Sequence, residues 1–185
     1  MNQRILEVSY RDPQEELIAQ CKRGNRQAQF KLYKLYSKAM YNTALRIVAD
    51  ADEAADVLQE AFMDAFRRLE SFKQESTFGL WMKQIVVNKS LSSLRKRKDM
   101  LPLEELPDIP EDEKEEEHTS FQVAQIKKAM NQLADGYRIV LSLYLIEGYD
   151  HEEIAHILKI SENTSRTQFL RAKRKLIQLL KAHRG

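Results

Sequence analysis

The chain has little material for strands, disulfides or membrane spans. Its 185 residues include five glycines, four prolines and one cysteine, Cys21, which cannot form an internal disulfide. Runs of β-branched residues, which favour strands, are few. No apolar run approaches the ~18 residues of a membrane-spanning helix, and residues 1–10 have no signal-peptide core. We therefore expect an all-α cytoplasmic protein without membrane insertion.

Motifs of common catalytic and cofactor sites are also missing. The sequence has no P-loop, no dinucleotide fingerprint and no nucleophile elbow, so we expect no catalytic residues and no cofactor. His151, Glu152 and His156 resemble a zinc-protease helix motif, which needs its histidines four residues apart on one face. Here they are five apart, which turns them about 140° away from each other on a helix. We expect no metal site.

Charge is distributed along the chain in blocks. The chain is 43% hydrophobic and 31% charged, but its net charge is only +2, so any affinity for nucleic acid must come from local patches. Residues 101–120, LPLEELPDIPEDEKEEEHTS, contain three of the four prolines and a dense acidic run. Such a composition is typical of a flexible, self-repelling linker. It divides the chain into two small domains, residues 1–100 and 121–185.

Residues 1–100 read as four helices. Asp12 and Pro13 open the first helix and Gly24 ends it. Helices are expected over 26–48, from Asp50 to about Phe72, and over 78–98. The fourth ends in the basic run from Arg95 to Lys98. Its expected inner stripe is Trp81, Ile85, Asn88 and Leu91 or Leu94.

Residues 121–185 end in a helix-turn-helix pattern, after two helices expected over 121–133 and 136–146. Asp150 and Glu153 form a capping box, Lys159 to Ser161 make the turn, and Ser161 caps the second helix. Residues at helical spacing predict the inner face of that helix: Ser165, Phe169, Ala172, Leu176 and Leu180. The opposite face carries long donors, small hydroxyls and one apolar tip, which suit base edges: Arg166, Thr167, Gln168, Leu170, Arg171 and Arg174.

A helical hairpin with a solvated basic face is the simpler interpretation of this pattern. However, the span from Arg166 to Arg184 contains seven basic residues and no acidic one. A solvated face usually mixes both signs, whereas a run of one sign favours contacts with phosphates.

Two blocks of the sequence resemble the bacterial RNA polymerase sigma factors of the extracytoplasmic-function (ECF) group. The first block is Ala55-Asp56-Val57-Leu58-Gln59-Glu60-Ala61-Phe62 with Phe78-Gly79-Leu80-Trp81, Asn88 and Leu94-Arg95, and it resembles sigma region 2. The second is Tyr137-Arg138-x-Val140-Leu141 with Glu153-Ile154-Ala155, Ser161, Thr164 and Arg171-Ala172-Lys173, and it resembles region 4. The sequence departs from the family pattern at a few positions. Lys159 replaces a common turn glycine, and Ser165 stands where valine is frequent.

The resemblance implies a promoter-specificity subunit without catalytic chemistry. Region 2 would bind a coiled coil of the polymerase clamp through an acidic helix face next to an apolar anchor: Asp56, Gln59, Glu60 and Phe62. It would also hold the melted −10 element through aromatic, polar and basic residues: Phe72, Ser76, Trp81, Asn88, Arg95 and Arg97. Region 4 would bind the polymerase flap and contact the −35 element: Thr164, Arg166, Thr167, Gln168, Arg171 and Lys175. An anti-sigma factor is a further expected partner.

Two alternatives stay open on the sequence. A response-regulator-type activator has a similar helix-turn-helix, but needs a receiver or ligand domain, normally α/β, before it. A helical adaptor that binds only protein would leave the basic C-terminal helix without a function.

Overall fold

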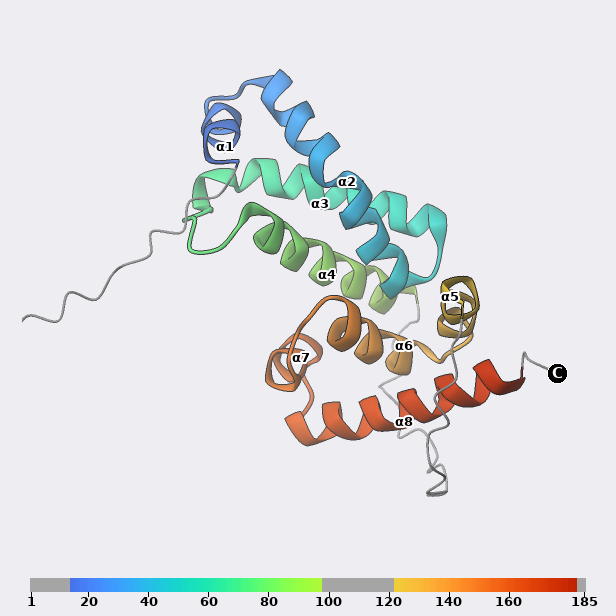
Figure 1. Cartoon of the computed structure of the whole chain (residues 1–185). Coiled ribbons are helices and arrows are strands. Elements are labelled where there is room, and N and C mark those ends of the chain that lie inside the picture. Colours follow the sequence, from blue (N-terminus) through green and yellow to red (C-terminus); the bar gives the residue numbers. More distant parts are fainter. Residues whose placement is uncertain (1–13, 98–121, 183–185) are drawn as a thin grey trace, which may run out of the picture. The chain divides into compact units, whose positions relative to one another are not determined.

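The structure is a computed structural model that describes residues 14–97 and 122–182. Every regular element in these two ranges is a helix (Figure 1), as the composition predicts. The described residues divide into two compact units, one comprising 14–45 together with Asp50–Ser93, and the other comprising Arg46–Ala49, 94–97 and 122–182. None of the described helices is long and apolar enough to cross a lipid bilayer.

The helices of the N-terminal half end close to where the sequence predicts. They are α1 (Glu15–Lys22), α2 (Arg26–Val48), α3 (Ala51–Arg67), the 3₁₀ turn η1 (Leu69–Ser71) and α4 (Phe78–Arg97). Gly24 follows α1 with φ +78°, a conformation that glycine adopts without strain. Asp50 caps α3 by accepting a hydrogen bond of 2.8 Å from the Glu53 N–H. Asp12 and Pro13 lie outside the described residues, and Gln14 is the N-cap of α1.

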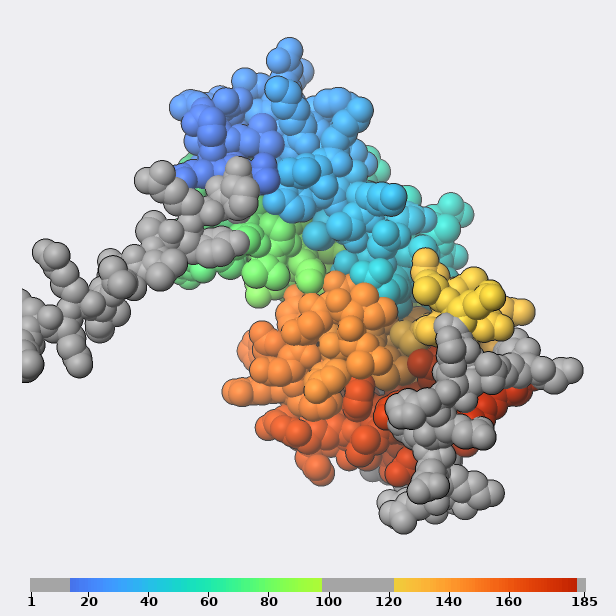
Figure 2. Space-filling model, viewed as in Figure 1, coloured from blue at the N-terminus to red at the C-terminus, as the bar shows by residue number. Residues whose placement is uncertain are grey.

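The first unit packs α1, α3 and most of α2 and α4 around an apolar core. Fully buried members include Ile18, Leu32, Phe78 and Met82. Burying a side chain of this size contributes about 1.5–3 kcal/mol. Figure 2 shows this unit from the side that α1 and α2 cover. Several apolar side chains of α2 stay exposed, Phe30 and Leu35 among them.

The buried face of α4 agrees with the predicted one only at Leu91 and Leu94. Asn88 is exposed, and Trp81 and Ile85 are only half-buried. The buried positions instead form a stripe rotated by about one residue: Phe78, Met82, Val86, Val87, Ser90, Leu91 and Leu94. Ser90 fits on this face because its hydroxyl donates a 2.8 Å hydrogen bond to the Val86 carbonyl within the same helix. Because this buried stripe includes a serine, the spacing of the apolar residues alone does not mark the buried face of α4.

The longest helix of the second unit is α8 (Glu162–Ala182), which leads to the C-terminus marked in Figure 1. Against it pack α5 (Val123–Asn131), α6 (Asp135–Leu141) and α7 (His151–Leu158). The core cluster of this unit joins α5, α6 and α8: Met130, Leu133, Tyr137, Leu141 and Ala172, with Phe169, Leu176 and Leu179 against it. The predicted inner face of α8 is therefore confirmed.

The helix predicted over 136–146 changes type part-way. After α6 the chain forms a π-helical turn, η2 (Ser142–Ile146). Ser142 and Leu143 are buried, while Tyr144, Leu145 and Ile146 are exposed. Such wide turns are uncommon and often occur at functional positions.

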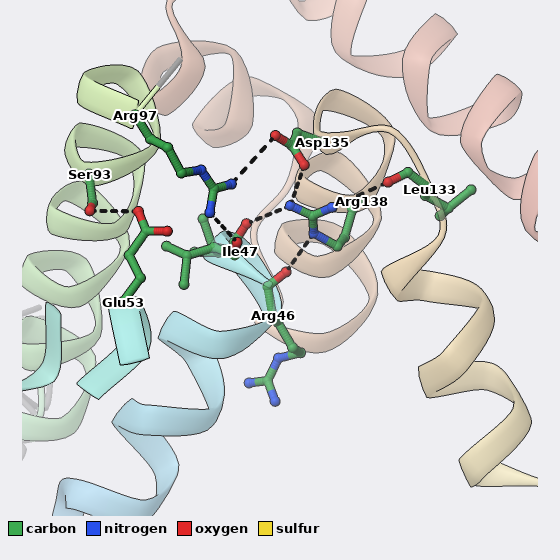
Figure 3. A network of polar contacts seen from close by, with 9 residues as sticks. Arg46, Ile47, Glu53, Ser93, Arg97, Leu133, Asp135 and Arg138 are labelled. Carbon is green, nitrogen blue, oxygen red and sulfur yellow. Dashed lines mark hydrogen bonds and ion pairs between the residues drawn. The ribbon is translucent and has the colours of Figure 1, made fainter. Parts of the chain in front are cut away.

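A buried arginine, Arg138, organises the second unit around α6 (Figure 3). Its guanidinium donates to three main-chain carbonyls, those of Leu133 at 3.2 Å, Ile47 at 3.0 Å and Arg46 at 3.3 Å. It also pairs with the carboxylate of Asp135. The side chain is only 3% exposed. A buried charge without hydrogen-bond partners would destabilise the fold, and these four acceptors replace the water that the guanidinium loses.

Candidate nucleic-acid and protein interfaces

The helix-turn-helix forms as its caps predict. The Asp150 carboxylate accepts from the Glu153 N–H at 2.8 Å, and the Glu153 carboxylate accepts from the Asp150 N–H at 2.9 Å. α7 then ends at Lys159, whose φ of 59° is left-handed. Ser161 accepts a 3.0 Å hydrogen bond from the Thr164 N–H and so starts α8. These capping bonds fix where α7 begins and where α8 begins, and thereby fix the geometry of the turn between them.

Basic side chains dominate the outward face of α8. Arg166 and Lys175 are exposed, and Arg171 is half-buried. Arg166 donates from Nε to the Glu162 carboxylate at 3.2 Å, which keeps its guanidinium beside the first turn of the helix. Such a surface can contact bases and phosphates together.

The small and amide side chains of this face are less exposed than Arg166. Thr167 and Gln168 are half-buried, and the Thr164 hydroxyl lies 2.8 Å from that of Ser161. The Gln168 Oε1 atom is buried, and no described residue hydrogen-bonds to it. Gln168 therefore lies at the margin of the reading face, as its position in the helix predicts.

A polar and aromatic cluster holds the first turns of α8 against α7, and no pattern in the sequence indicates it. The Ser165 hydroxyl lies 2.9 Å from Nδ1 of His151. The His151 ring stacks on Tyr144, with centroids 4.5 Å apart, and meets the ring of Phe169 edge-on at 5.6 Å. Burial and the nearby Arg166 lower the pKa of His151, against the opposing effect of Glu162 and Asp150. The neutral imidazole is thereby favoured.

The predicted polymerase-binding face lies on α3. Asp56, Gln59 and Glu60 are all exposed, and their spacing places them along one side of the helix. Phe62, however, is 3% exposed, and its ring meets that of Tyr33 edge-on in the first unit. Phe62 belongs to the inward stripe of α3 and lies behind the acidic face. The exposed apolar side chain beside it is Met63, at 50%.

Lys89 of α4 adds a positive charge to this face. Its Nζ atom lies 2.8 Å from Asp64 Oδ2 and 3.3 Å from Glu60 Oε2. The hydrogen bond from Lys89 lowers the pKa of Asp64, and the same bond raises the pKa of Lys89. Only the folded chain brings Lys89 to α3, so the sequence pattern did not reveal this contact.

The residues predicted for single-stranded DNA include a compact aromatic cluster. The ring centroids of Phe72 and Trp81 are 5.1 Å apart, and those of Phe78 and Trp81 are 5.7 Å apart. Phe72 is 3% exposed, so it supports the half-buried Trp81 from behind and cannot itself stack on a base. Ser76, in the loop before α4, is half-buried and donates to the Thr77 carbonyl at 3.4 Å.

The remaining predicted −10 residues are spread along α4. Asn88 is exposed in the middle of the helix, and Arg95 and Arg97 are exposed in its last turn. Arg97 donates to the Val48 carbonyl at 3.3 Å. Fourteen residues separate Trp81 from Arg95, about 20 Å at 1.5 Å per residue. A strand held by both must therefore run along the helix.

Both halves of the chain match known sequence families. Residues 32–99 match the model of Sigma-70 region 2, and residues 124–176 match that of Sigma-70, region 4. The chain belongs to the sigma-70 family. It falls within the extracytoplasmic-function group of these RNA polymerase sigma factors, which direct transcription initiation. Neither matched model describes an enzyme.

Curated relatives align over most of the chain. The RNA polymerase sigma-H factor of Pseudomonas aeruginosa is 28% identical over 172 residues, covering 86% of this chain and 89% of the relative. The ECF RNA polymerase sigma factor SigM of Mycobacterium tuberculosis is 28% identical, with 89% and 83% covered. SigW of Bacillus subtilis is 27% identical, with 89% and 95% covered.

Solved structures share the fold. The sigma factor RpoE in complex with the anti-sigma factor NepR from Bartonella quintana superposes with a TM-score of 0.57 at 26% identity, covering 82% of this chain and 95% of that one. CnrH in complex with the cytosolic domain of CnrY gives a TM-score of 0.56 at 24% identity, covering 90% and 96%.

Proposed function

We propose that this sigma factor uses three separate surfaces: an acidic face of α3 for core polymerase, the aromatic cluster and α4 for the melted −10 element, and α8 for the −35 element. The observation that carries the proposal is α8 itself. A capped turn of fixed geometry leads directly into a helix whose outward face is basic along its length.

The polymerase contact is assigned to Asp56, Gln59 and Glu60. Their exposed carboxylates and amide offer acceptors on one helix face, and the exposed Met63 supplies apolar area next to them. A polar rim around an apolar centre is a common layout for a protein interface. The clamp coiled coil is the expected partner of this face, and the polymerase flap is the expected partner of the C-terminal unit.

The −10 contact is assigned to a face that begins at Trp81. The exposed part of its indole offers a stacking surface for an unpaired base, and Phe72 and Phe78 hold the ring from behind. Asn88 and the last turn of α4 continue the same path with a hydrogen-bonding side chain and two exposed arginines. Ser76 lies in the loop that would receive a flipped base.

The −35 contact is assigned to the N-terminal half of α8. Arg166, Thr167 and Arg171 lie on the outward side of the first turns, where a recognition helix meets base edges. Thr164 and Gln168 flank them, and Lys175 lies one turn beyond Arg171, within reach of phosphates.

The other parts of the assignment follow from this scheme. We infer that residues 1–100 act as region 2, 121–185 as region 4 and 101–120 as the linker. A subunit of RNA polymerase without catalytic chemistry acts in the cytoplasm. An anti-sigma factor is a further partner, which the likeness to RpoE bound to NepR supports.

Two measurements test the proposal together. The purified chain should co-purify with core polymerase, and the reconstituted holoenzyme should start transcripts at discrete positions in run-off assays on genomic fragments. Binding to core without new transcripts would favour a helical adaptor. DNA binding without core binding would favour a regulator of the response-regulator type, although residues 14–97 are helical where that class has an α/β domain.

A further inference from the structure

Ser165 occupies an unusual place for a polar residue. It lies in the first turns of α8, between the proposed −35 residues Thr164 and Arg166, and its side chain is 0% exposed. A buried hydroxyl requires a hydrogen-bond partner, because an unsatisfied one is destabilising. Nδ1 of His151, 2.9 Å away, provides it.

The His151 ring is itself fixed by three elements. It belongs to the first residue of α7, stacks on Tyr144 of η2 with an interplanar angle of 21°, and meets Phe169 of α8 edge-on. Tyr144 and Phe169 also contact each other, with centroids 4.6 Å apart. Rings in such mutual contact restrict rotation of the imidazole, so Nδ1 points to one place.

We propose that His151 is a positioning residue for promoter reading, which acts through the Ser165 hydroxyl to set where the first turns of α8 meet DNA. This inference rests on the proposed reading of the −35 element by α8. A shift of about 1 Å in this turn would move Arg166 out of bonding distance of a base edge, because hydrogen bonds weaken steeply with geometry. The effect would appear in discrimination between sequences more than in overall affinity for DNA.

The charge on His151 should control this contact. In the neutral ring Nδ1 can accept the Ser165 proton, whereas in the protonated ring Nδ1 donates, so the hydroxyl must turn to accept and the bond reverses its direction. Protonation also adds a cation near Arg166 of α8, with Glu162 of α8 and Asp150 before α7 as the opposing carboxylates. Tyr144, from η2, contributes a neutral ring. Discrimination between −35 sequences should therefore weaken as the pH falls through the pKa of His151, which lies below the usual value of about 6.5.

The test uses the full chain bound to core polymerase and a promoter obtained from run-off transcription. The quantity measured is the ratio of affinities for the promoter with its own −35 element and with a scrambled one. Four variants are compared: His151→Ala, Ser165→Ala, their combination, and His151→Asn, whose amide can bond from the position of Nδ1. His156→Ala is the matched control, since His156 is exposed on the same helix.

We expect each alanine variant to lower the ratio about fivefold, the effect of one lost hydrogen bond. The double variant should be no worse than either single one, because both remove the same contact. His151→Asn should stay within about twofold of the original chain, and His156→Ala should not change the ratio.

The pH profile gives a second readout that a purely structural role would not move. The ratio for the original chain and for His156→Ala should fall between pH 7 and pH 5, whereas that for His151→Asn should stay level. A level profile for the original chain, or alanine variants that lose thermal stability but keep the ratio, overturns the inference. If His151→Ala does not fold, His151→Asn and the two profiles still decide. A chain that never distinguishes the two −35 elements overturns the inference and the proposed reading by α8 together.

Discussion

The ammonium group of Lys89 on α4 lies 2.8 Å from the Asp64 carboxylate on α3. The same nitrogen is 3.3 Å from Glu60, which belongs to the proposed polymerase-binding face. One lysine thus links this face to α4 and partly neutralises its carboxylates.

Replacing Lys89 with glutamine should change how stability depends on pH. The lowered pKa of Asp64 adds stability above its unfolded pKa, near 3.9, and this is lost as the pH falls through the folded value. The raised pKa of Lys89 adds stability below its unfolded value, which is lost as the pH rises through the folded one. Urea unfolding at several pH values should therefore show a smaller loss between pH 5 and pH 3 for Lys89→Gln. Lys96→Gln, on the exposed side of α4, should show the same dependence of unfolding free energy on pH as the original chain. If Lys89→Gln also shows the dependence of the original chain, the prediction is wrong.

Removing Asp56 and Glu60 together should weaken core binding about tenfold or more while helicity is kept. Both carboxylates are exposed on α3, so their loss leaves the core of the unit intact. Affinity for core polymerase, measured by competition with the unmodified chain, is the readout. Glu70→Ala with Glu75→Ala is a matched control, because it removes two exposed carboxylates elsewhere in the unit. Equal losses in the two double variants would indicate a general charge effect.

Arg171→Ala and Lys181→Ala should affect DNA in different ways. An arginine paired with guanine contributes roughly 1–3 kcal/mol of discrimination, whereas a lysine on phosphate adds affinity for any sequence. Arg171→Ala should therefore lower the preference for the cognate −35 element. Lys181→Ala, exposed near the end of α8, should weaken cognate and scrambled duplexes by the same factor and reduce the dependence on salt. Equal weakening of both duplexes by Arg171→Ala would show that this part of α8 does not read bases.

Lys159→Gly should stabilise the helix-turn-helix. Lys159 has a φ of 59°, a left-handed conformation that is less favourable by about 1 kcal/mol for residues with a Cβ. We expect a rise of about 0.5–1 kcal/mol in the free energy of unfolding, after allowing for the greater freedom of glycine in the unfolded chain. Lys175→Gly, inside α8, should lower stability by about 1 kcal/mol and thereby identify which calorimetric transition belongs to this unit. A lower melting temperature for Lys159→Gly would contradict the prediction.

The sequence predicted the helix-turn-helix in detail because its geometry depends on neighbours in the chain. Asp150 with Glu153, and Ser161 with Thr164, are three residues apart, and each pair bonds as the capping pattern requires. Lys159, which replaces a common turn glycine, is left-handed with a φ of 59°.

The sequence predicted less where the position of a side chain depends on burial and on residues distant in the chain. Asn88 was expected on the buried face of α4 but is exposed, whereas Ser90 is buried with its hydroxyl bonded within the helix. The bonds of Ser165 to His151 and of Lys89 to Asp64 join residues 14 and 25 positions apart, and no local pattern indicates them.

The aromatic cluster around Trp81 also provides an intrinsic fluorescence signal. Trp81 is the single tryptophan, so the tryptophan fluorescence of the free chain comes entirely from the surface proposed to hold the melted strand. A base that stacks on the half-buried indole should quench this emission, whereas duplex DNA bound by α8 should leave it nearly unchanged. Titration with single-stranded oligonucleotides would then show, without any label, when a strand lies along α4.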